Sequence, residues 1–80
     1  MKINEKWLPL PQLDLEGNSF IRIENHQGIL DFSDQLLKLR MKGMIYQVEG
    51  ERLWIKGVTK REIFVEGNIK ALRIVEETAQ

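Results

Sequence analysis

His26 is the only histidine in this 80-residue chain, and several side chains near it in sequence could work with it in catalysis. Imidazole titrates near neutral pH, and a carboxylate such as Glu24 or Asp31 can fix its tautomer, as a general base requires. A hydrolase also needs a nucleophile, for which Ser33 is the nearby candidate. Neither Ser33 nor the second serine, Ser19, lies in a recognisable nucleophile elbow. We therefore predict that the protein is not an enzyme.

The same segment offers a poor set of ligands for a metal ion. His26 is accompanied by the carboxylates Glu24, Asp31 and Asp34, without the spaced ligand pairs that are typical of zinc sites. The chain has no cysteine, so thiolate ligands and disulfides are excluded, as fits a reducing compartment. We predict neither a metal site nor a cofactor.

The segment around His26 is more typical of a turn than of a chemical site; its turn-forming residues are Glu24, Asn25, His26 and Gly28. Asn25 tolerates a left-handed backbone and can close an Asx turn. His26 can hydrogen-bond across such a turn, and Gly28 then restarts the chain. We interpret the segment as a corner between two strands.

The elements that would position this corner are strands, because apolar and charged residues alternate along most of the chain. Ile21 and Ile23, for example, alternate with Arg22 and Glu24. A period of two indicates a sheet with one face on a core. The predicted strands span residues 12–16, 19–25, 28–32, 36–42, 44–49, 52–57, 62–66 and 69–75.

Glycine separates these runs. Glu-Gly precedes a new run three times, at Gly17, Gly50 and Gly67, and tight hairpins require the positive φ that glycine adopts. The predicted fold class is all-β: a small antiparallel meander of seven or eight short strands, curled into a barrel or sandwich. A short β-roll is the alternative.

One segment, residues 33–42, also has features of a helix. Ser33 would suit an N-cap and Gly43 a C-terminal glycine, with good helix formers between them. Leu37 and Leu39 nevertheless alternate with charged residues, and we favour a strand.

The chain is short enough for one domain with a thin core. Pro9 and Pro11 favour extended geometry, so residues 1–11 are predicted to be an N-terminal arm. Residues 12–75 form the predicted β domain, and residues 76–80 a frayed tail.

The charge balance and hydropathy of the sequence argue against general nucleic-acid binding, secretion and membrane insertion. Twelve basic and twelve acidic side chains balance, which removes the main driving term for general nucleic-acid binding. The sequence has neither the apolar run of a secretory signal nor a stretch near the about 20 residues of a membrane span. We expect a cytoplasmic protein that does not itself insert into a membrane.

Three stretches of the sequence together carry a family resemblance. They are "LPQLDLEGN", "IENHQGILDFSD" and the glycine-punctuated "KGMIYQVEGERLWIKGVTKREIFVEGNIKALRI". From about Leu8 to Val75 the chain resembles the YabP/YqfC family of sporulation proteins, and more closely its YqfC branch. The run Ile-Glu-Asn-His-x-Gly-Ile, followed by Phe-Ser, is the most specific part.

The resemblance implies a role in spore development or coat assembly in the mother cell of an endospore-forming bacterium. It also implies pairing with a membrane-embedded sporulation protein, which would associate this chain with the membrane through its partner. No catalytic residue carries over from the family. The residues around His26 carry over as a family signature without an assigned role.

An outward row of aromatic residues is the candidate interface. If Leu53 and Ile63 face the core, Trp54 and Phe64 face outward, joined by Tyr46 from the preceding strand. Exposed aromatics on one sheet face mark a contact surface. The alternative is that the N-terminal arm covers them as a second packed layer. Self-association by strand-edge pairing of residues 69–75 is a further expectation.

The rival function, from another class, is a small nucleic-acid-binding β-barrel. It would use the same aromatics as stacking platforms, together with Lys38, Arg40 and Lys56. The ordinary interpretation of these cations is a solvated strand face, and we favour that interpretation.

Overall fold

The structure is a computed structural model that describes residues 10–76, and all of its regular elements are β-strands. They form one antiparallel sheet in the order β1-β2-β6-β5-β4-β3. The strands are β1 (Gln12–Glu16), β2 (Phe20–Glu24), β3 (Ile29–Phe32), β4 (Leu36–Met41), β5 (Met44–Val58) and β6 (Glu62–Glu76).

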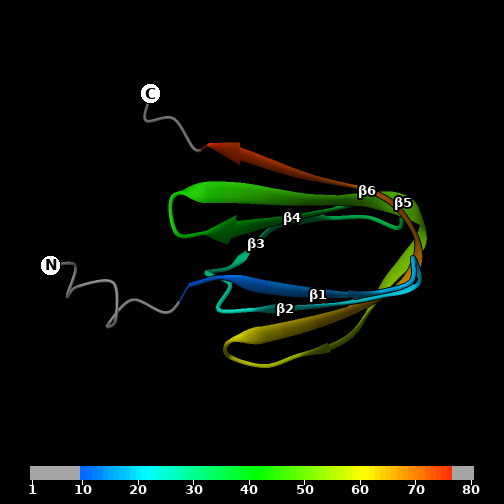
Figure 1. Cartoon of the computed structure of the whole chain (residues 1–80), viewed down its shortest axis with the longest axis horizontal. Helices are drawn as coiled ribbons and strands as arrows, with labels where there is room; N and C mark the ends of the chain where they lie inside the picture. The colour runs from blue at the N-terminus through cyan, green and yellow to red at the C-terminus, as the bar shows by residue number, and fades with distance from the viewer. Residues whose placement is uncertain (1–9, 77–80) are drawn as a thin grey trace, which may run out of the picture.

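The sheet folds back on itself because its two central strands, β5 and β6, are long and sharply bent (Figure 1). The first layer contains β1, β2, the first half of β6 and the second half of β5. The second layer contains β3, β4, the first half of β5 and the second half of β6. The result is a sandwich of two half-sheets that share one bent hairpin.

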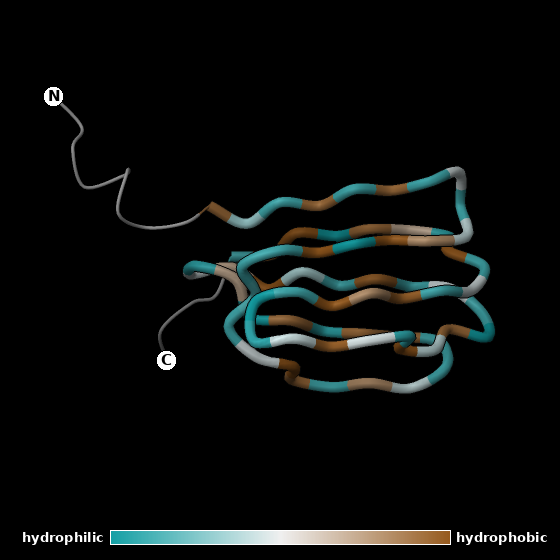
Figure 2. The backbone as a smooth tube through the Cα atoms, turned by 90° about the horizontal axis from the view of Figure 1, so that it is seen from below, coloured by the Kyte–Doolittle hydropathy of each residue, from teal (hydrophilic) through white to brown (hydrophobic). Residues whose placement is uncertain are grey.

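Side chains that point inward from both layers make the core. Ile21 and Ile23 come from β2 in the first layer, and Leu37 and Leu39 from β4 in the second; all four are fully buried. Figure 2 shows the alternation of hydrophilic and hydrophobic residues along the strands that makes this possible. The remaining buried residues are Met41, Val48, Leu53, Ile63, Val65 and Ile69.

Two glycines allow β5 and β6 to approach each other closely at the bend. Gly67 has a φ of 148°, and a Cβ there would lie 2.7 Å from the carbonyl oxygen of Arg52 and 2.8 Å from the Cα of Leu53. A Cβ at Gly50 would overlap the carbonyl oxygen of Asn68. Each strand therefore needs a glycine where the backbone of the other strand crosses it.

The bend shifts the register between β5 and β6, and two turns accept hydrogen bonds from backbone amides of both strands there. The amides of Gly67 and Ile69 donate to carbonyls of the β1–β2 turn, at 3.1 and 2.8 Å. The amides of Gly50 and Leu53 donate to carbonyls of the β3–β4 turn, at 3.0 and 2.8 Å. The four accepting carbonyls belong to Asn18, Ser19, Asp34 and Gln35. Four backbone amides at the bend are thus satisfied.

The predicted all-β fold class is confirmed, and so is the strand in the ambiguous segment, which is β4. The number of strands is six rather than seven or eight. The difference arises because Gly50 and Gly67 lie inside β5 and β6 as bends, whereas we expected each to separate two strands. Gly17 does lie in a turn between strands, as expected.

The predicted arm and tail fall mostly outside the described residues. Of residues 1–11 the structure describes Leu10 and Pro11, and of residues 76–80 it describes Glu76. Residues 10–76 contain no helix, and so none that could cross a membrane.

Replacing Gly67 with alanine is expected to destabilise the fold by about 3 kcal/mol, because the new Cβ meets backbone atoms and alanine disfavours this φ. Gly57→Ala is the matched control, since its Cβ would meet only a side-chain atom of Phe64 at 3.4 Å. We expect this control to stay within about 1 kcal/mol of the parent. Urea denaturation followed by circular dichroism measures both; equal losses would contradict the role assigned to Gly67.

Candidate functional site

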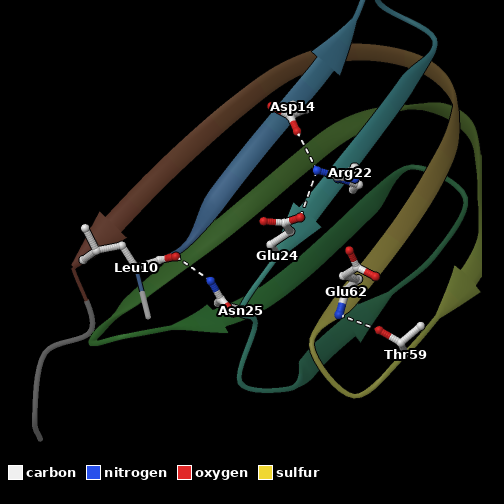
Figure 3. Close-up of polar contacts among 7 residues, drawn as sticks. All are labelled: Leu10, Asp14, Arg22, Glu24, Asn25, Thr59 and Glu62. Atoms are coloured by element: carbon white, nitrogen blue, oxygen red, sulfur yellow. Dashed lines mark hydrogen bonds and ion pairs between the residues drawn. The ribbon is translucent and has the colours of Figure 1, made fainter. Parts of the chain in front are cut away.

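The corner at Glu24–Gly28 connects the two layers of the sandwich, running from the end of β2 to the start of β3. Asn25 adopts a left-handed backbone with a φ of 67°. Its amide donates to the carbonyl of Arg61 at 2.6 Å, and its side-chain Nδ2 donates to the carbonyl of Leu10 at 2.7 Å (Figure 3). One asparagine thereby joins the β5–β6 loop, the corner and the segment that precedes β1.

The half-buried imidazole of His26 binds main-chain groups through both ring nitrogens. Nδ1 accepts from the amide of Gly28 at 3.2 Å, and Nε2 lies 3.4 Å from the carbonyl oxygen of Thr59. Because Nδ1 accepts and the carbonyl can only accept, this geometry assigns the proton of the neutral ring to Nε2. The pattern from Nδ1 to the amide two residues later is that of an Asx turn, with imidazole in place of the amide oxygen.

The end of the corner is fixed to β4. The amide of Gln27 donates to the carbonyl of Arg40 at 2.7 Å, and the amide of Arg40 donates to the carbonyl of Gly28 at 3.0 Å. Gln27 Oε1 also accepts from the amide of Lys42 at 3.2 Å. Its contacts therefore make this corner a structural joint.

The carboxylate of Glu24 is directed to a neighbouring cation. Glu24 Oε2 lies 2.9 Å from Nη2 of Arg22, and the same nitrogen lies 3.3 Å from Asp14 on β1 (Figure 3). Within residues 10–76, no three side chains of the metal-ligating types lie close enough together to hold a metal ion.

Aromatic side chains gather on the outer face of the first layer. The rings of Phe20 on β2 and Phe64 on β6 stack, with centroids 6.3 Å apart and planes inclined by 20°. Trp54 on β5 lines the same shallow depression as Phe20, and half of its surface is exposed. We call Phe20, Trp54 and Phe64 the aromatic patch.

A cation and an anion border this patch. Lys56 Nζ lies 3.0 Å from Oε2 of Glu66 and 6.0 Å from the centroid of the Phe20 ring. Glu16 lines the depression on the side of β1. The patch thus has an apolar centre and a mixed, charged rim.

Two of the three predicted interface residues, Trp54 and Phe64, lie on this face, but Tyr46 does not. Tyr46 belongs to the second layer and packs against the core on the inner face. The change of layer at the bend separates it from Trp54, although both belong to β5.

The structure adds Phe20 to the predicted set. A signal for it was present in the sequence, because Phe20 precedes Ile21 in the alternating run and so belongs to the face of Arg22 and Glu24. Its strand neighbour Phe64 could be identified only once β2 and β6 were known to pair.

The cations that a nucleic-acid site would use lie on different faces. Lys38 and Arg40 alternate with the buried Leu37 and Leu39, so they point outward from the second layer. Lys56 points outward from the first layer and is paired with a carboxylate. Lys56 therefore shares a surface with Trp54, but Lys38 and Arg40 belong to the other layer, so the three cations and Trp54 do not form one surface.

Comparison with known proteins identifies related sequences. The profile of the YabP family matches residues 9–80. The chain is 36% identical over 69 residues to Bacillus subtilis (strain 168) "Uncharacterized protein YqfC", an alignment that covers 86% of this chain and 74% of that protein. No solved structure is significantly similar.

Truncating His26 should weaken the joint in proportion to the hydrogen bonds that are lost. His26→Ala removes both ring contacts and is expected to cost about 1 to 2 kcal/mol of unfolding free energy. His26→Asn retains an acceptor for the Gly28 amide and should lose about half as much. Chemical denaturation compares the two variants; equal stability of His26→Ala and the parent would show that neither contact stabilises the corner.

Proposed function

Since the chain belongs to the YabP family, we propose that it is a non-enzymatic sporulation protein that acts as an adaptor. In this proposal it works in the cytoplasm of the mother cell, during spore development or coat assembly. It binds a membrane-embedded sporulation protein and is held at the membrane through that partner.

The exposure of Trp54 is the observation that carries the adaptor proposal. A tryptophan left half exposed beside two stacked phenylalanines costs solvation free energy that a partner would recover by covering it. Aromatic anchors of this kind dominate the energetics of protein interfaces. The charged rim of Glu16, Lys56 and Glu66 matches the usual plan of an apolar centre within a polar border.

The contacts of the family signature support a non-enzymatic role. Both ring nitrogens of His26 are directed at main-chain groups, and Asn25 binds two carbonyls. These contacts hold the corner in its shape, and this structural role is sufficient to explain why an asparagine and a histidine are present there. In this proposal the signature preserves the joint between the layers, and the aromatic patch makes the contact.

Trp54→Ala should abolish recovery of the membrane partner when the tagged protein is purified from sporulating cells and its associates are identified by mass spectrometry. The substitution removes the most exposed aromatic anchor while leaving the core untouched, so the free energy of unfolding should change by less than about 1 kcal/mol.

Val58→Ala is the matched control for this experiment. Val58 is also on the second half of β5 and is 51% exposed, but it lies outside the aromatic patch. We expect Val58→Ala to recover the partner as the parent does. Recovery of the same proteins by Trp54→Ala and the parent would contradict the proposal. Recovery of nucleic acid, with an affinity that falls steeply as salt is raised, would favour the rival function instead.

A further inference from the structure

Within residues 10–76, the second half of β6 is an open strand edge. β2 pairs with β6 along residues 62–66, and the amides of Gly67 and Ile69 are taken by the β1–β2 turn. From Lys70 to Glu76, the described part of the chain pairs with β6 on the β5 side alone. Figure 1 shows this half of β6 at the outer border of its layer.

Apolar side chains are exposed along this edge. Leu72 pairs with Val48, and Ile74 with Tyr46, so both side chains are on the inner face of the second layer. Their exposed fractions are 38% and 59%, and that of Val75 on the outer face is 43%. A regular apolar edge that no described strand covers is the kind of surface to which another strand adds.

The sequence of this edge is complementary to itself. In an antiparallel pairing with two-fold symmetry centred on Arg73, Lys70 lies opposite Glu76 of a second copy, and the reverse pair forms by symmetry. The same register places Leu72 opposite Ile74, so apolar side chains meet on the inner face. Moving the centre by one residue, onto Leu72 or Ile74, shifts the register by two and places Lys70 or Glu76 opposite an apolar residue instead.

The two Arg73 side chains, which meet at the symmetry axis, are already neutralised within each chain. Arg73 Nε donates to Glu49 Oε2 at 2.8 Å on the outer face of the second layer. Each guanidinium therefore enters the pairing as half of an ion pair, which reduces the repulsion across the axis.

The other three edges suit this pairing less well. A two-fold pairing of β1 would place Asp14 opposite itself, with no cation in the strand. β3 has only four residues and a register shift between Ile29 and Asp31. The exposed half of β5 is interrupted by a register shift between Ile55 and Gly57. Charges and irregularities of these kinds protect strand edges from pairing.

We propose that the protein forms a symmetric homodimer through the second half of β6, in which the two second layers join into one continuous eight-stranded sheet. The interface is separate from the aromatic patch, which lies on the outer face of the first layer. The dimer would therefore present two aromatic patches. Whether the dimer forms does not depend on whether the protein acts as an adaptor.

Cysteine cross-linking tests the register, because the chain contains no cysteine of its own. Arg73→Cys places two thiols opposite each other at the axis, within reach of a disulfide. Under mild oxidation we expect a band at twice the 9.4 kDa of one chain on a non-reducing gel. Gln47→Cys is the matched control, because Gln47 pairs with Arg73 one strand further in and should remain a monomer on the gel.

Charge reversal tests the same register without cross-linking. Lys70→Glu and Glu76→Lys each replace two attractive pairs with two repulsive ones, and each should raise the dimer dissociation constant about tenfold. The double variant restores opposite charges across the axis and should return the constant to within about threefold of the parent. All of these side chains are exposed, so circular dichroism should show unchanged folding.

Sedimentation equilibrium of the parent protein measures whether it is a monomer, a dimer or a larger assembly, and its result is combined with those of the variants. The proposal is supported if the apparent mass rises with protein concentration to that of two chains. It is also supported by the cross-link at Arg73→Cys and by the rescue in the double variant. A monomer at concentrations up to about 1 mM overturns it. An assembly larger than a dimer, equal cross-linking of Gln47→Cys, or a double variant as weak as the sum of the single variants overturns it as well.

Discussion

The close crossing of β5 and β6 at the bend is the constraint on which the rest of the structure depends. The crossing turns one six-stranded sheet into two facing layers, and only then do the apolar faces of β2 and β4 bury each other. It requires Gly50 and Gly67, because each lies against the backbone of the opposite strand. Turns from the first half of the chain accept hydrogen bonds from four backbone amides at this crossing.

The same bend determines what each part of the surface can do. It places Trp54 on the outer face of the first layer and Tyr46 on the inner face of the second, although both belong to one strand. It also carries the second half of β6 beyond the reach of β2, which leaves that half with an open edge. An aromatic face and a strand edge thus arise from one hairpin and point in different directions.

Local alternation was sufficient to predict strands and their buried faces, because a period of two needs only neighbouring residues. Ile21, Ile23, Leu53 and Ile63 are buried as their patterns indicated. The roles of Gly50 and Gly67 were not accessible in this way, since a hairpin turn and a bend within a strand both favour glycine. What distinguishes them is the opposite strand, here the backbone of Asn68 and of Arg52.

In the candidate sites, too, features that depend on neighbouring residues were predicted, whereas contacts between residues far apart in the sequence were not. The corner around His26 was predicted as a turn, and the structure shows Asn25 in the left-handed conformation that such a turn uses. The partners of this corner, Arg61 and Arg40, are distant in sequence and were not predicted. Phe20 was likewise omitted from the aromatic patch, because its neighbour Phe64 comes from another strand.

The dependence of the bend on two distant turns also bears on how the chain folds. The β1–β2 turn precedes β6, the strand that it contacts, by four described strands; the side chains of Asn18 and Asn68, which bond at 3.1 Å, are 50 residues apart. The amides at the bend of the β5–β6 hairpin obtain these acceptors only when both turns lie against it, and contacts of this sequence separation slow folding. Both layers contain part of β5 and part of β6, so we expect folding to be cooperative and to be completed only once β6 is available.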